Sequence, residues 1–101
     1  MSKDHLTIAV DFDMTFTADP ALFGSMIRLM RERGHTVLLV TCRKKTFENE
    51  REISLALKAQ GIQIPILMTS HNLKSQYCTE QGYRVHIWID DAPENISEVR
   101  S

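Results

Sequence analysis

Four short, mostly apolar runs alternate along the chain with longer segments in which apolar residues recur at helical spacing. The runs cover residues 6–10, 36–41, 64–68 and 85–89. Continuous apolar runs of this length are typical of strands that are buried on both faces of a sheet. Strands of this kind joined by helices form parallel sheets with right-handed crossovers. The sequence therefore predicts an α/β fold in the order β-α-β-α-β-α-β-α, with an α+β arrangement as the alternative.

The segment after the first run carries the start and stop signals of a helix. Asp19 is a good N-cap, Pro20 suits the first helical position, and Gly34 suits the end. The spacing predicts an inward face made of Leu22, Met26, Leu29 and Met30.

Two further helices are predicted by similar signals. The second starts near Thr46 and ends at Gly61, with an inner stripe of Ile53, Ala56 and Leu57. The third is capped by Ser70 or Asn72 and ends at Gly82. In the third apolar run, Pro65 cannot donate to a strand ladder, so we expect an edge strand there. Pro93 would open a short terminal helix.

Size, charge and cysteine usage narrow the class of protein. The 101 residues correspond to one domain, residues 1–101, and the formal charge of −1 argues against bulk electrostatic binding to nucleic acid or anionic membranes. Cys42 and Cys78 lack the spacing of a disulfide scaffold or a thiolate zinc site. No apolar run approaches the roughly 18 residues of a membrane span. We therefore expect a cytoplasmic protein that does not bind membranes.

Polar side chains follow three of the four apolar runs, at the point where each predicted strand ends. They are Asp11 and Asp13, then Thr41, Cys42 and Arg43, and finally Asp90 and Asp91. Ligands of open α/β sheets bind outside the carboxyl ends of the strands, so these groups are expected to converge. Clustered carboxylates repel one another unless a cation lies among them, and oxygen ligands without His or Cys favour magnesium.

The first two groups resemble motifs of the haloacid dehalogenase-like (HAD) phosphatase superfamily. Asp11, Asp13 and Thr15 match its DxDxT signature directly after a strand. Thr41 stands where the second motif has Ser or Thr. The DxDxT signature after a strand is fairly specific, whereas Thr41 alone would be weak.

The later motifs of this superfamily are matched in the same order along nearly the whole chain. Lys74, at the start of a predicted helix, resembles the third motif. Asp90 and Asp91, with Asn95 four positions after the second of them, resemble the fourth. The closing acidic motif makes the combination strong.

The resemblance implies a magnesium-dependent phosphomonoester hydrolase. Asp11 would be the nucleophile that forms an aspartyl-phosphate. Asp13 would act as general acid and then as general base, and its backbone carbonyl would bind magnesium. Asp11 and Asp91 would bind the metal directly, with Asp90 in support, although the roles within the acidic pair could be reversed.

The remaining residues would position the phosphate. Thr41 would donate a hydrogen bond to a phosphoryl oxygen, and Lys74 would offset the negative charge, with Lys44, Lys45 and Arg84 as rivals for that role. Arg43 either contacts the substrate phosphate or faces water. Thr15 would orient the loop that carries Asp13, and Asn95 would support the metal site.

The chain leaves no room for the cap domain of this superfamily. The resemblance therefore implies a minimal Rossmann-like three-layer sandwich, with about four parallel strands in the order 4-1-2-3 and helices on both faces. A site without a cap is open, which suits a large phosphorylated substrate, or a small one enclosed by a neighbouring subunit of a homo-oligomer. A nucleotide or a nucleic-acid-end phosphate is the favoured substrate, by analogy alone.

Two other functions fit the same residues less well. A non-catalytic module could bind magnesium and a phosphorylated partner, but binding alone would not require an acid/base residue at Asp13. A receiver-type phosphoacceptor domain would carry its aspartate in the middle strand, and residues 64–69 contain none.

Overall fold

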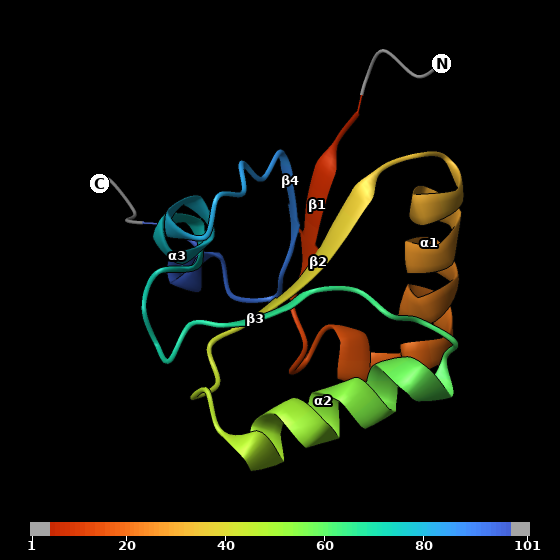
Figure 1. Cartoon of the computed structure of the whole chain (residues 1–101), viewed down its shortest axis with the longest axis horizontal. Coiled ribbons are helices and arrows are strands. Elements are labelled where there is room, and N and C mark those ends of the chain that lie inside the picture. Colours follow the sequence, from red (N-terminus) through yellow and green to blue (C-terminus); the bar gives the residue numbers. More distant parts are fainter. Residues whose placement is uncertain (1–4, 98–101) are drawn as a thin grey trace.

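The computed structural model describes residues 5–97 and contains one four-stranded sheet (Figure 1). The strands are β1 (Thr7–Val10), β2 (Thr36–Thr41), β3 (Ile66–Met68) and β4 (Ile87–Ile89). All neighbouring strands pair in parallel, in the order β3-β2-β1-β4. This is the expected order 4-1-2-3 read from the opposite edge, so the predicted α/β class is confirmed.

Helices cover both faces of this sheet. They are α1 (Pro20–Glu32), α2 (Phe47–Ala59) and α3 (Lys74–Glu80), with short 3-10 helices η1 (Phe16–Ala18) and η2 (Pro93–Asn95). On one face, Ile27 of α1 and Leu57 of α2 pack in the main apolar cluster. On the other face, Cys78 of α3 packs against Leu38 and Val40. Figure 1 shows α1 and α3 on opposite sides of the strands. The result is the expected three-layer arrangement.

The helix starts follow the sequence signals for α1 and α2 but not for α3. The Asp19 side chain accepts a hydrogen bond from Leu22 N at 3.1 Å, and the Thr46 side chain caps α2 in the same way. The prediction that Ser70 or Asn72 caps α3 is wrong. The Asn72 amide instead donates to the Thr69 carbonyl at 2.8 Å, which closes the preceding turn. This local bond uses the side chain that a cap would need.

The predicted inward face of α1 is partly wrong. Leu22 and Leu29 are exposed at 51% and 57%, while Gly24 and Ile27 are buried. Gly24 determines this orientation because a Cβ atom there would lie 3.0 Å from the Cβ of Gln60 at the end of α2. The missing side chain lets the two helices approach closely, so the face that carries the glycine is buried and the two leucines are not.

Two histidines fix the start of β1 between its neighbours. Leu6 N donates to His35 Nδ1 at 3.1 Å, and Thr7 N donates to His86 Nδ1 at 3.0 Å. Each histidine precedes a strand that pairs with β1, so its ring continues the backbone ladder beyond the end of the strand.

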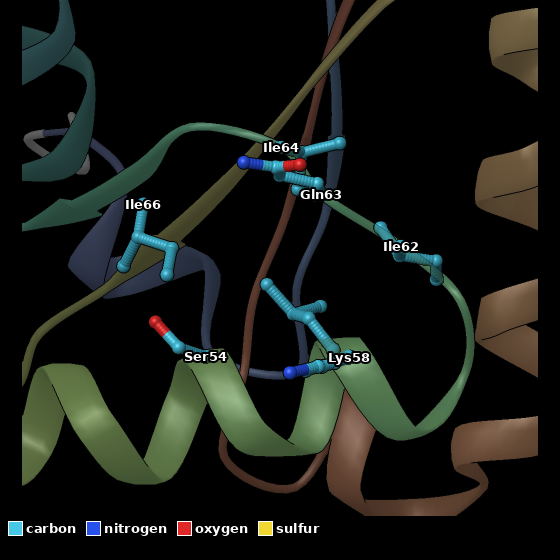
Figure 2. Close-up of a pocket in the computed structure, with 7 residues that line it drawn as sticks. Ser54, Lys58, Ile62, Gln63, Ile64 and Ile66 are labelled. Atoms are coloured by element: carbon cyan, nitrogen blue, oxygen red, sulfur yellow. The ribbon is translucent and has the colours of Figure 1, made fainter.

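A cavity of about 350 Å³ lies between α2 and the segment that leads into β3 (Figure 2). Ser54 and Lys58 of α2 line it on one side, and Ile64 and Ile66 line it on the other. The predicted edge position of the third strand is confirmed, with Pro65 directly before it. Among the described residues, none of the helices combines the length and the apolar character that crossing a membrane requires.

Candidate active site

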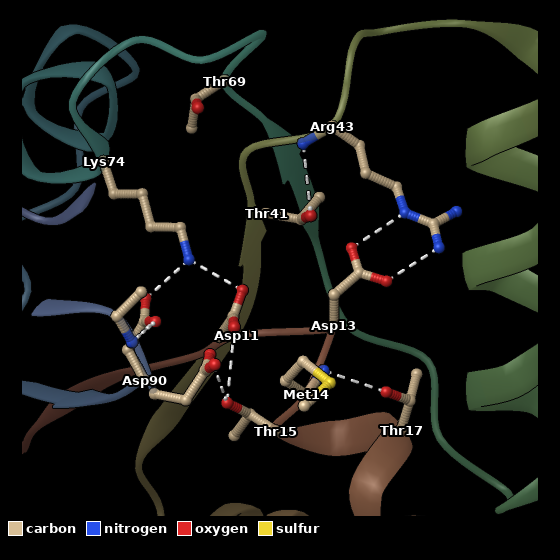
Figure 3. A network of polar contacts seen from close by, with 12 residues as sticks. Asp11, Asp13, Met14, Thr15, Thr17, Thr41, Arg43, Thr69, Lys74 and Asp90 are labelled. Atoms are coloured by element: carbon tan, nitrogen blue, oxygen red, sulfur yellow. Dashed lines mark hydrogen bonds and ion pairs between the residues drawn. The ribbon is translucent and has the colours of Figure 1, made fainter. Parts of the chain in front are cut away.

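Three carboxylates converge at the carboxyl edge of the sheet, as the strand order predicts (Figure 3). Asp11 directly follows β1, and Asp90 and Asp91 follow β4, which pairs with β1. Oxygen atoms of the three side chains all lie within 4.8 Å of one another. The Asp11 backbone N–H also donates to the Ile89 carbonyl at 2.9 Å, which ties the two strand ends together.

Lys74 of α3 brings a buried positive charge to these carboxylates. This helix covers the face of the sheet opposite α1 and α2. Lys74 is the first residue of α3 and is 1% exposed. Its Nζ lies 2.7 Å from Asp11 Oδ1 and 2.5 Å from Asp90 Oδ2. Burial lowers the pKa of Lys74, but the bonds to Asp11 and Asp90 outweigh it, so the pKa lies above its ordinary value and the group stays charged. Three carboxylates and one ammonium leave a formal charge of −2.

Asp11 pays an electrostatic penalty for ionisation at this position. Its pKa is raised from 3.8 to about 6, mainly by burial and to a lesser extent by the contact with Asp91 and the charge of Asp90, while Lys74 lowers it. The Thr15 hydroxyl lies 3.3 Å from Asp11 Oδ2 and 3.3 Å from Asp91 Oδ1. A hydroxyl has one proton to donate, so it serves only one of these two oxygens at a time. Oxygens of Asp11, Asp90 and Asp91 lie close enough together to hold one metal ion.

The Asp13 carboxylate points away from this group and forms a bidentate ion pair with Arg43. The two bonds are 2.9 Å from Arg43 Nε and 2.8 Å from Nη2. Arg43 Nη2 also lies 3.0 Å from Glu52, and Nη1 donates to Asn49 at 3.3 Å. The guanidinium carbon lies 5.1 Å from the centre of the Phe12 ring. The bonds to Asp13 and Glu52 raise the pKa of Arg43, so its charge is permanent.

The two threonines of the predicted motifs lie beside these charges. Thr41 ends β2 and is 1% exposed, and its hydroxyl accepts from Arg43 N at 3.3 Å. Its own proton can therefore point to another acceptor. A shallow cavity of about 260 Å³ adjoins the carboxylates, lined by Met14, Thr15, Ala18, Phe23, Ile89, Asp90 and Asp91. This opening gives a ligand access to the group.

The structure brings together most of the residues that the sequence singled out, but not all. Asp11, Asp90, Asp91, Lys74 and Thr15 form one contact network, and Asp13 pairs with Arg43 next to it. Asn95 is exposed in η2, and within the described chain its side chain makes no hydrogen bond to the carboxylates.

The position of Lys74 distinguishes it from the alternatives left open by the sequence. Lys44, Lys45 and Arg84 are exposed, whereas the Lys74 ammonium is enclosed by carboxylates.

Sequence reasoning missed Asn49 and Glu52, which hold the Arg43 guanidinium from α2. Their spacing of three residues on one helix was the available signal.

Comparison of the chain with models of protein families, with curated proteins and with solved structures gave no match. The likeness to HAD phosphatases therefore depends on the motif residues themselves.

Proposed function

We propose that this protein is a magnesium-dependent phosphomonoester hydrolase that acts through an aspartyl-phosphate on Asp11. The observation that carries the proposal is the group formed by Asp11, Asp90, Asp91 and Lys74, with its formal charge of −2 at the open carboxyl edge of the sheet. A divalent cation would balance that charge, and hard carboxylate oxygens without nitrogen or sulfur donors suit magnesium.

The metal would be held by Asp11, Asp90 and Asp91, because these three side chains offer oxygens close enough to share one ion. When bound, it would draw the phosphate to the carboxylates and stabilise the negative charge that develops on the phosphoryl oxygens. Lys74 would add a fixed positive charge beside the phosphate, because its two ion pairs already orient the ammonium group. Burial and the neighbouring carboxylates raise the pKa of Asp11 even with Lys74 in place, and a bound cation would oppose that shift.

The chemistry would take two displacements. In the first, an oxygen of Asp11 attacks phosphorus, the bond to the leaving oxygen breaks, and that oxygen takes a proton from Asp13. In the second, Asp13 takes a proton from water, the water oxygen attacks phosphorus, and the bond to Asp11 breaks. Inorganic phosphate and the free carboxylate of Asp11 result. The Thr41 hydroxyl would donate to a phosphoryl oxygen in both steps.

The Arg43 ion pair bears on the role of Asp13. Two guanidinium bonds hold both oxygens of the Asp13 carboxylate, the group that would take a proton from water in the second displacement. For the first displacement Asp13 must carry a proton, which requires it to leave Arg43. Glu52 and Asn49 would keep the guanidinium in place when that happens.

The openness of the site favours a phosphate at the end of a large molecule. The cavity beside the carboxylates is shallow, and Met14 on its rim is 74% exposed. A nucleotide or a nucleic-acid-end phosphate remains the preferred substrate, by analogy. We also propose a cytoplasmic setting, since both Cys42 and Cys78 are free thiols.

Hydrolysis of an aryl phosphate and of a nucleotide panel, with magnesium and with EDTA, tests the proposal. We expect turnover that depends on magnesium and is abolished in Asp11→Asn. Asp19→Asn is the matched control, because Asn caps α1 as well as Asp does and lies outside the site. Turnover that survives Asp11→Asn would exclude Asp11 as the nucleophile.

A binding module without catalysis is the second candidate, favoured by the bidentate engagement of Asp13 with Arg43. It predicts that aluminium fluoride or beryllium fluoride binds with magnesium while no phosphate ester in the panel is hydrolysed. If neither these phosphate mimics nor magnesium bind, both candidates fail.

A further inference from the structure

In the part of the chain that the structure describes, the outer edge of β3 has backbone groups without a hydrogen-bond partner, at a place where Leu67 and Met68 are only 7% and 3% exposed. β3 lies at one end of the sheet, and Leu39 N of β2 donates to the Pro65 carbonyl at 2.9 Å. Because backbone groups alternate in direction along a strand, those of Leu67 face β2 and those of Ile66 and Met68 face outward. Within residues 5–97, the outward N–H and C=O groups of Ile66 and Met68 have no hydrogen-bond partner. Such an edge is a template for a further strand.

Two cavities adjoin this edge. On the α2 face is the 350 Å³ cavity with Ser54 and Lys58 (Figure 2). A second cavity of about 390 Å³ runs along the strand, between Glu50 of α2 and the residues Tyr77 and Tyr83. An added strand would lie in this second cavity, and because its side chains alternate between the two faces, one set would point toward the first cavity.

We propose that the strand added here is β3 of a second copy of this chain, in antiparallel orientation. A twofold axis through Leu67 places Ile66 opposite Met68 of the other copy, and Met68 opposite Ile66. Each of these two pairs exchanges two N–H···O=C bonds, so four bonds use all the outward groups. The two sheets would join into one continuous sheet of eight strands.

The charges on α2 favour a second copy over another extended chain. Glu50, Ser54 and Lys58 are exposed, lie four residues apart, and line the two cavities. The same twofold axis sets the two α2 helices antiparallel, with Glu50 opposite Lys58 of the other copy. Ser54 would meet its own counterpart at the axis, where a small side chain permits close approach. Ser54 of α2 and Ile66 of β3 line the same cavity. The pairing of the strands and the pairing of the charges on α2 would therefore occur at the same position along the edge.

This pairing is independent of the proposed function and leaves the candidate site accessible. Antiparallel β3 strands point their carboxyl ends in opposite directions, so the two carboxylate groups lie at opposite ends of the joined sheet. The second copy therefore does not cover the site. A contact made by one short strand and one helix face belongs to the small interfaces, so the dimer is weak and depends on concentration.

Sedimentation of the full chain over a range of concentrations tests the pairing. We expect a monomer–dimer equilibrium that is weakened about tenfold or more by Glu50→Lys or by Lys58→Glu, because each change places like charges opposite one another at two symmetric positions. The double variant Glu50→Lys/Lys58→Glu restores opposite charges and should restore the dimer. Residues 50 and 58 lie two helical turns apart, so a change within one chain would not produce this rescue.

Glu48→Lys is the matched control, because it reverses a charge in the same first turn of α2 outside the two cavities next to β3. We expect it to leave the dimer unchanged. Hydrogen exchange should slow at the Ile66 and Met68 amides as concentration rises. A chain that stays monomeric up to about 1 mM, or a dimer in which the double variant shows no rescue, overturns the proposal.

Discussion

Replacing Asp11 by Asn should stabilise the protein when no divalent cation is present. The folded protein holds the pKa of Asp11 at about 6, against 3.8 for the free side chain. At pH 7 both states are ionised, and the difference corresponds to about 3 kcal/mol of lost stability. Asn resembles the protonated carboxyl in shape and has no charge, so the variant avoids this penalty.

The pH dependence of the difference follows from the direction of the shift. Below about pH 4 the carboxyl is protonated in both states and contributes no penalty. Between pH 4 and 6 the unfolded chain releases its proton first, so the wild-type stability falls as pH rises through this window. In Asp11→Asn this fall is absent. The advantage of the variant therefore grows from near zero at pH 4 to about 3 kcal/mol at pH 7.

Urea unfolding in EDTA, followed from pH 4 to pH 7, measures this difference, and a melting temperature about 10 to 20 °C higher should accompany it. With magnesium at 100 times its dissociation constant the difference should close, because binding stabilises the wild type by about 3 kcal/mol. Asp19→Asn should follow the wild type in both buffers. An Asp11→Asn variant that is less stable than wild type in EDTA at pH 7 would refute the reasoning.

Three further substitutions test other parts of the structure. Lys74→Met removes the buried ammonium from two carboxylates and should cost about 3 to 5 kcal/mol in urea unfolding at pH 7; a smaller loss would mean that the carboxylates are not buried as ions. Arg43→Lys keeps the charge but not the fork that holds Asp13, so kcat should fall about 10- to 100-fold while stability changes by less than about 1 kcal/mol. Gly24→Ala should lose about 1 kcal/mol instead of gaining about as much, because the new methyl group would meet Gln60 at 3.0 Å; a rise in melting temperature would contradict this packing.

The convergence of Asp11 with Asp90 and Asp91 could be predicted because topology alone brings it about. Parallel neighbouring strands present their carboxyl ends at one edge, so residues directly after β1 and β4 must meet there. The same reasoning placed Lys74 only to within a few candidates. Its choice depends on where α3 begins, and that start lacks the side-chain cap that the sequence suggested.

Features that depend on how helices cross were beyond the sequence. The orientation of α1 follows from the contact between Gly24 and Gln60, which are far apart in the chain. The hydrogen bonds that hold the Arg43 guanidinium require α2 to place Asn49 and Glu52 beside the loop after β2. Periodicity shows that a helix has a face, but not which of two partly apolar faces the rest of the fold will cover.

β4 follows β1, β2 and β3 in the sequence, which has a consequence for the order of folding. Asp11 and Asp90 lie 79 positions apart, and the strand that delivers Asp90 and Asp91 is synthesised after the other three strands of the described sheet. Until β4 docks on β1, Lys74 lacks one of its two carboxylate partners, and the oxygens proposed to bind the metal are incomplete. A nascent chain can therefore bury the cores around β1, β2 and β3 while still unable to hold a divalent ion. Binding of a divalent ion would therefore begin only when β4 docks on β1, late in folding.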